Sequence, residues 1–71
     1  MADKLIRKSN RVTIYIKDIA LITGRGISSA RRLYWAIMKS FDKKPGQFIT
    51  FQEFSIYTGI DEEVIQDYLR N

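Results

Sequence analysis

The sequence predicts a mainly α fold of four short helices arranged as two helical hairpins, which a small two-stranded β pairing can connect. Three observations lead to this prediction. Apolar residues recur with a helical period in several stretches, glycines and a proline separate those stretches, and the two halves of the 71-residue chain resemble each other. A chain of this length forms one domain, because it cannot bury two separate cores.

The first half of the chain starts with polar and basic residues and then becomes periodic. Residues 1–10 show no sustained period, so we expect a flexible basic arm there and the folded domain over residues 11–71. Residues 12–16 alternate aliphatic side chains with Thr and Tyr, which is typical of a short strand with one covered face. A helical period follows over residues 17–23, and Gly24 stands where a helix can end in a left-handed conformation.

The longest periodic stretch predicts a helix from about residue 28 to residue 42. Ser28 suits its N-cap position, because the hydroxyl can accept a hydrogen bond from a free backbone N–H of the first turn. The sequence Lys43-Lys44-Pro45-Gly46 then ends the helix, since proline cannot continue it and Pro-Gly favours a tight turn. The apolar residues with helical spacing are Ala30, Leu33, Tyr34, Ile37, Met38 and Phe41.

Two shorter helices are predicted in the second half. Thr50 and Glu53 have the spacing of a capping box, in which each side chain accepts a hydrogen bond from the other residue's backbone N–H. They open a helix that runs to Gly59, and Asp61 is expected to cap the last helix. The apolar stripe of that last helix consists of Val64, Ile65, Tyr68 and Leu69.

The two halves match each other at an offset of 35 residues. Residues 16–24 fall on residues 51–59 with apolar over apolar and acidic over acidic positions, and an extended segment precedes each stretch. If the repeat reflects an approximate two-fold symmetry, residues 13–15 lie antiparallel to residues 48–50. The side chains predicted to be buried together are Ala20, Leu33, Ile37, Phe41, Phe54 and Leu69.

Charge is distributed unevenly along the chain. Residues 1–35 carry eight Lys or Arg and two Asp, whereas residues 36–71 carry four Lys or Arg and six Asp or Glu. The net charge of +4 alone says little about partners, but this separation indicates that one half binds an anion.

Several classes of function are excluded by composition. The chain has no Cys and no His, so it lacks disulfides and the usual zinc ligands, and we expect no cofactor. The carboxylates have no evident pocket and Gly24-Arg25-Gly26 lacks the spacing of a phosphate-binding loop, so we expect no enzyme. No apolar run approaches the roughly 18 to 20 residues of a membrane span and the N-terminus has no export signal, which predicts a cytoplasmic protein.

Ala20 and Gly24 have the spacing of a helix-turn-helix. This motif needs a small residue where its helices cross and a glycine four positions later, where the chain turns. The polar face of the second helix suits a DNA major groove, because short hydroxyls allow close approach and arginine can bond a guanine edge through two parallel N–H groups. The predicted base contacts are Ser28, Ser29, Arg31 and Arg32.

Other basic residues suit the phosphates of double-stranded DNA. Those beside the turn after the long helix could contact phosphates as a wing does, and those of the arm could follow the backbone or enter a minor groove. The alternative for each of them is an ordinary solvated surface. The predicted phosphate contacts are Arg25, Lys39, Lys43, Lys44, Arg7, Lys8 and Arg11.

The stretch from Tyr15 to about Lys39 resembles small bacterial helix-turn-helix proteins of the MerR and excisionase type, as found in Bacteroides and their mobile elements. The resemblance implies DNA binding in gene regulation or element excision, with Arg31 as the groove contact. The chain departs from the pattern directly after the glycine, where two further residues precede an apolar one, which predicts a longer turn. The matching residues are Asp18, Ala20, Gly24 and Ala30-Arg31, with Tyr34-Trp35 close behind.

Two alternatives remain. In a protein-interaction adaptor, Trp35, Tyr57 and the acidic last helix would form a docking face, and the acidic half could also pair with a second copy. A continuous basic face on the Ser28 helix favours DNA, whereas a face broken by Asp18 or Asp42 favours the adaptor. Single-stranded nucleic-acid binding needs several exposed aromatic residues beside arginine, and here most aromatic residues fall on core stripes. Trp35 lies off the stripe, so it either packs against the first helix, which we expect, or marks a contact surface.

Overall fold

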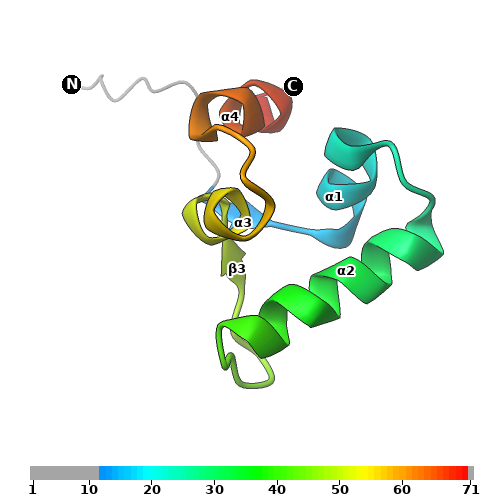
Figure 1. Cartoon of the computed structure of the whole chain (residues 1–71), viewed down its shortest axis with the longest axis vertical. Helices are drawn as coiled ribbons and strands as arrows, with labels where there is room; N and C mark the ends of the chain where they lie inside the picture. Colours follow the sequence, from blue (N-terminus) through cyan, green and yellow to red (C-terminus); the bar gives the residue numbers. More distant parts are fainter. Residues whose placement is uncertain (1–11, 71) are drawn as a thin grey trace.

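The computed structural model describes residues 12–70, which form four helices and a small two-stranded antiparallel sheet, as the sequence predicts (Figure 1). Helix α1 packs against α2, α3 packs against α4, and α1 also contacts α4. The elements in chain order are β2 (Thr13–Ile14), α1 (Ile16–Thr23), α2 (Ile27–Ser40), β3 (Ile49–Thr50), α3 (Phe51–Thr58) and α4 (Glu62–Arg70).

The two strands pair as the internal repeat predicts. Ile14 lies opposite Ile49 and Thr13 lies opposite Thr50, in an antiparallel register. Ile14 and Ile49 are 35 positions apart, so each residue of this pair faces its own equivalent in the other half. An antiparallel pair of equivalent residues is what an approximate two-fold axis between the two halves requires.

The repeat extends to the hydrogen bonds that start the two short helices. At α1, the Tyr15 N–H donates to Oδ2 of Asp18 over 2.8 Å. At α3, the Thr50 N–H donates to Oε1 of Glu53 over 2.9 Å, and the Glu53 N–H donates to the Thr50 hydroxyl, which completes the predicted capping box. Tyr15 and Thr50 are equivalent positions, as are Asp18 and Glu53, so an acidic side chain anchors both helices in the same way.

The same two helices also end alike. The hydroxyl of Thr23 donates to the carbonyl oxygen four residues earlier at 2.6 Å, and that of Thr58 does so at 2.7 Å. Gly24 and Gly59 follow, with φ angles of 74° and 80°, in the left-handed region that only glycine adopts at little cost. The predicted glycine stops are therefore confirmed in both halves.

The core gathers around the paired strands. Of the six residues predicted to share it, Ile37, Phe54 and Leu69 are buried, whereas Ala20, Leu33 and Phe41 are only partly buried and pack against its edge. Ile14 and Ile49 of the two strands, which the prediction did not include, are fully buried. The buried apolar residues are Ile14, Ile19, Ala30, Ile37, Met38, Ile49, Phe51, Phe54, Ile65 and Leu69.

Candidate nucleic-acid interface

A three-residue turn joins α1 to α2. Gly24 ends α1 by donating its N–H to the Ala20 carbonyl over 2.9 Å, which fits the predicted alanine–glycine spacing. Gly26 is extended, and its carbonyl accepts from the Ala30 N–H over 2.9 Å, so α2 begins at Ile27. The prediction that Ser28 caps this helix is therefore wrong, because Ser28 already lies inside the first turn.

The side of α2 that faces away from the core carries Ser28, Arg31, Arg32, Trp35 and Lys39, which we call the outer face. All five are exposed. At about 100° per residue, they spread over roughly 100° of the helix surface, opposite the buried side that contains Ala30 and Ile37. Packing of that buried side against the rest of the domain thus holds the outer face toward solvent.

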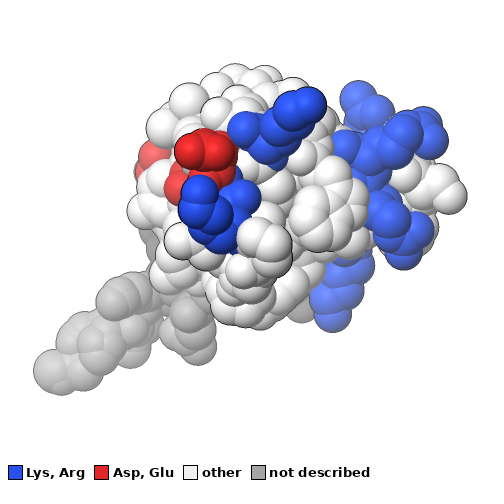
Figure 2. All heavy atoms as spheres, turned by 90° about the horizontal axis from the view of Figure 1, so that it is seen from below, with Lys and Arg blue, Asp and Glu red and all other residues white. Residues whose placement is uncertain are grey.

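No acidic residue interrupts the outer face. The sequence contains no Asp or Glu from residue 19 to residue 41, and Asp18 is buried, where it caps α1. Asp42 is exposed just after α2, in a left-handed conformation with φ of 53°, and so bounds the face at its end. Figure 2, the view from below Figure 1, shows blue side chains along this surface and red ones confined to one side.

Arg25 and Ser29 lie at the start of α2 and contact each other. Nη1 of Arg25 donates to the Ser29 hydroxyl over 2.8 Å, which places the guanidinium against the first helical turn. Ser29 is half-buried and its hydroxyl is already an acceptor, so it is less open to a base edge than Ser28. Of the four predicted base contacts, Ser28, Arg31 and Arg32 are exposed.

Lys43 has a partner inside the molecule. Its Nζ lies 2.8 Å from Oε1 of Glu53, and both side chains are largely buried, with 15% and 24% of their surface exposed. Burial raises the pKa of Glu53, but hydrogen bonds from Lys43 and Thr50 and the charge of Lys43 outweigh it, so the net pKa is lowered. Lys43 therefore ties the turn after α2 to the capping box of α3, and we leave it out of the proposed interface.

Some of the remaining predicted phosphate contacts are exposed, and the others lie outside the residues that the structure describes. Lys39 and Lys44 are exposed, and the backbone N–H of Lys44 donates to Oε1 of Gln47 within the turn. Arg7, Lys8 and Arg11 lie outside the described residues.

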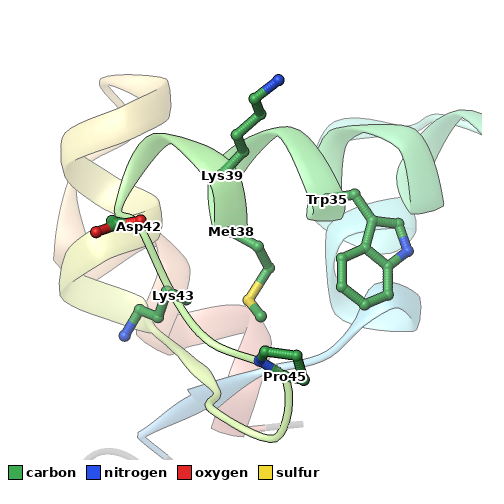
Figure 3. Close-up of a pocket in the computed structure, with 6 residues that line it drawn as sticks. All are labelled: Trp35, Met38, Lys39, Asp42, Lys43 and Pro45. Carbon is green, nitrogen blue, oxygen red and sulfur yellow. The ribbon is translucent and has the colours of Figure 1, made fainter.

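Trp35 is the large apolar residue of the outer face, and 56% of its surface is exposed. The sequence predicts packing against the first helix, but more than half of the side chain is open to solvent. Its ring meets that of Tyr34 edge to face at 5.2 Å, and it lines an open depression of about 370 Å³ together with Met38 and Pro45 (Figure 3). The helical period indicates this exposure, since Trp35 falls about 160° around the helix from the buried Ile37.

Residues 12–70 give no sign of two other kinds of site. Among them, no group of three or more Asp or Glu is arranged to hold a metal ion. The helices in the same part of the chain are too short or too polar to cross a lipid bilayer.

Comparison with known proteins gives no match. Protein-family models, curated proteins and solved structures were all compared with the chain. The functional assignment therefore rests on the geometry and charge of the α1–α2 hairpin.

Proposed function

We propose that the protein binds double-stranded DNA in a sequence-specific manner, with α2 in the major groove, as a transcriptional regulator or an excision accessory factor. The observation that carries this proposal is the outer face of α2, which is exposed and basic and is free of acidic residues. A polyanion is the partner that such a face attracts most strongly. A major groove about 12 Å wide admits one α-helix.

Sequence would be recognised by the first half of the helix. Arg31 and Arg32 lie in its first two turns, and each guanidinium can bond O6 and N7 of a guanine through two parallel N–H groups. Ser28 lies one turn earlier on the same face, where its short side chain lets the helix approach the base edges closely. These are the positions from which recognition helices generally contact bases.

Phosphates would be held at both ends of α2. The helix is 14 residues long, or about 21 Å, which exceeds the width of the groove that it enters. Arg25 stands before its first turn, Lys39 lies in its last turn, and Lys44 follows in the turn beyond. Basic residues at both ends can therefore reach the two backbones that border the groove, which fixes the orientation of the helix without reading sequence.

A protein-interaction adaptor is the second candidate, and it has an observation of its own. Ile56 and Tyr57 on α3 are 72% and 41% exposed, and Val64 and Tyr68 on the acidic α4 are also exposed. Exposed apolar side chains near a charged helix suit a protein partner. This surface belongs to α3 and α4, whereas the predicted docking face also includes Trp35, which lies on the outer face of α2.

Duplex binding at several salt concentrations tests the proposal. A preferred duplex is first selected from a random pool, and the affinity of the parent protein is compared with that of the Arg31→Ala and Arg32→Ala variants. Each variant should lose about 1 to 3 kcal/mol at the preferred duplex and much less at a random one. Lys44→Ala should weaken binding to both duplexes alike. It should also lower the slope of log affinity against log salt concentration by about one unit.

The matched control is Arg70→Ala, which removes an exposed arginine that contacts Asp67 on α4. It should leave the affinity unchanged, because α4 lies outside the proposed interface. A parent protein that fails to bind any duplex at low salt would contradict the proposal, and retained binding of a peptide or protein partner would then favour the adaptor.

A further inference from the structure

Trp35 has no structural role that accounts for its exposure. Its large aromatic side chain stays 56% exposed on a charged face, where it is open to contact by a ligand of that face. Its neighbours on the outer face are polar, so it is the one large apolar group there. It is also the single tryptophan of the chain.

Trp35 lies between two exposed cations of the outer face. Arg31 lies four residues before it and Lys39 lies four residues after it, so the three side chains form one line along α2. Arg31 and Lys39 are about 12 Å apart along the helix axis, with Trp35 halfway between them. A duplex that contacts both cations must therefore cover the indole.

The indole is also held in place before anything binds. Tyr34 packs edge to face against it, with the two ring planes at 88°. Met38 forms the middle of the depression and Pro45 borders it below, while Asp42 lies at the far end from Trp35 (Figure 3). Ordering this side chain on binding therefore costs little conformational entropy, which favours its use as a contact.

We propose, on the basis of the DNA-binding function above, that Trp35 packs against the 5-methyl group of a thymine and so selects an A·T pair beside the bases read by Arg31 and Arg32. Base edges in the major groove present hydrogen-bonding atoms and a single type of apolar group, the thymine methyl. The faces of an indole are apolar, so this methyl is the complementary feature among base edges. Lys39, one turn further along the helix, contacts the phosphate backbone of the DNA instead.

Replacement of thymine by uracil removes the methyl group and keeps base pairing. The affinity of the parent protein is measured for the preferred duplex and for the same duplex with every thymine replaced by deoxyuridine. The parent should lose about fourfold in affinity for each contacted methyl group, which corresponds to the transfer free energy of one such group. Trp35→Ala should bind the two duplexes equally, whereas Trp35→Phe, which keeps an aromatic ring, should still prefer thymine.

The matched control is Phe48→Ala, which removes an equally exposed aromatic side chain (57%) that packs on Tyr15 and is not part of α2. It should retain the full preference for thymine. Circular dichroism confirms that each variant is folded.

Fluorescence of the single tryptophan gives a second readout. Quenching by acrylamide should be strong in the free protein and weak in the complex with the preferred duplex. Duplex binding that leaves the quenching unchanged would overturn the inference, because Trp35 would then be uncovered. Protection from acrylamide with equal affinity for both duplexes would also overturn it, since the indole would then rest on deoxyribose. Absence of duplex binding by the parent would instead remove the proposed function itself.

Discussion

Glu53 and Asp18 show how one side chain can serve several parts of a small domain. Each is the third residue of a short helix. Each carboxylate accepts a hydrogen bond from the backbone N–H of the residue just before that helix. Glu53 in addition binds Lys43, so it connects the end of the α2 region to the start of α3. These carboxylates anchor the starts of α1 and α3 and so help to hold the frame that presents the outer face.

The lowered pKa of Glu53 predicts that acid destabilises the protein. A carboxyl group whose pKa is lower in the folded state contributes stability above its ordinary pKa of about 4.5, and this contribution is lost as the pH falls through the folded-state value. We expect the free energy of unfolding to decrease below about pH 4.5. In Glu53→Gln this decrease should be smaller and stability near pH 7 should be lower.

Urea denaturation at a series of pH values measures this effect. Glu62→Gln removes an exposed carboxylate from the first turn of α4 and serves as the control. Identical pH profiles for the parent protein and Glu53→Gln would show that the Lys43–Glu53 pair contributes nothing to folding.

Two isoleucines test the assignment of buried and exposed helix positions. Ile37 of α2 is fully buried, so Ile37→Ala leaves a cavity and should cost about 2 to 5 kcal/mol. Ile56 of α3 is 72% exposed, and Ile56→Ala should change stability by no more than about 0.5 kcal/mol. Thermal denaturation of the two variants measures both values, and similar melting temperatures would mean that the inner face of α2 is assigned incorrectly.

At the scale of the elements, the two hairpins are built on the same plan and differ in length and charge. The first helices both have eight residues, and the second helices have 14 and nine. Each turn starts with a glycine at positive φ. The longer α2 extends five residues beyond the length that α4 matches and so carries Lys39, whereas Trp35 stands where α4 has Arg70.

The turn glycines give a prediction with an internal control. The space around Gly24 and Gly59 is open, so alanine at either position meets no clash. The left-handed backbone alone should lower the stability of each variant by about 1 to 2 kcal/mol. Gly26 has a negative φ and caps α2, so Gly26→Ser should be neutral or stabilising by a few tenths of a kcal/mol. Equilibrium unfolding of the three variants measures the costs, and an equal loss in all three would contradict the role of positive φ.

Much of this element plan can be predicted from the sequence, because it depends on local signals. Gly24, Gly59 and the Thr50 capping box each act within a few residues, and the repeat predicts the strand register. The start of α2 could not be predicted in the same way, since Ser28 is a better cap by residue type than Gly26 and only the turn geometry decides between them. The Lys43–Glu53 pair and the partial burial of Leu33 depend on tertiary packing, which no local pattern contains.

For the whole molecule, the approximate two-fold symmetry of the backbone is broken by charge. Residues 19–41, from α1 through α2, are free of Asp and Glu, whereas α4 and the residue before it carry Asp61, Glu62, Glu63 and Asp67. We therefore expect the α1–α2 hairpin to face a polyanion and the acidic residues of α4 to point away from it. This asymmetry predicts a single orientation of the domain on DNA.

Binding of double-stranded DNA to the outer face of α2 can be mapped residue by residue, by nuclear magnetic resonance of the labelled protein during titration with the selected duplex. We expect the largest shift changes on the backbone amides of Ser28, Arg31 and Arg32 and on the indole N–H of Trp35. Amides of α4 should move little. Changes concentrated on α3 and α4, or no changes at any residue at low salt, would contradict the proposed interface.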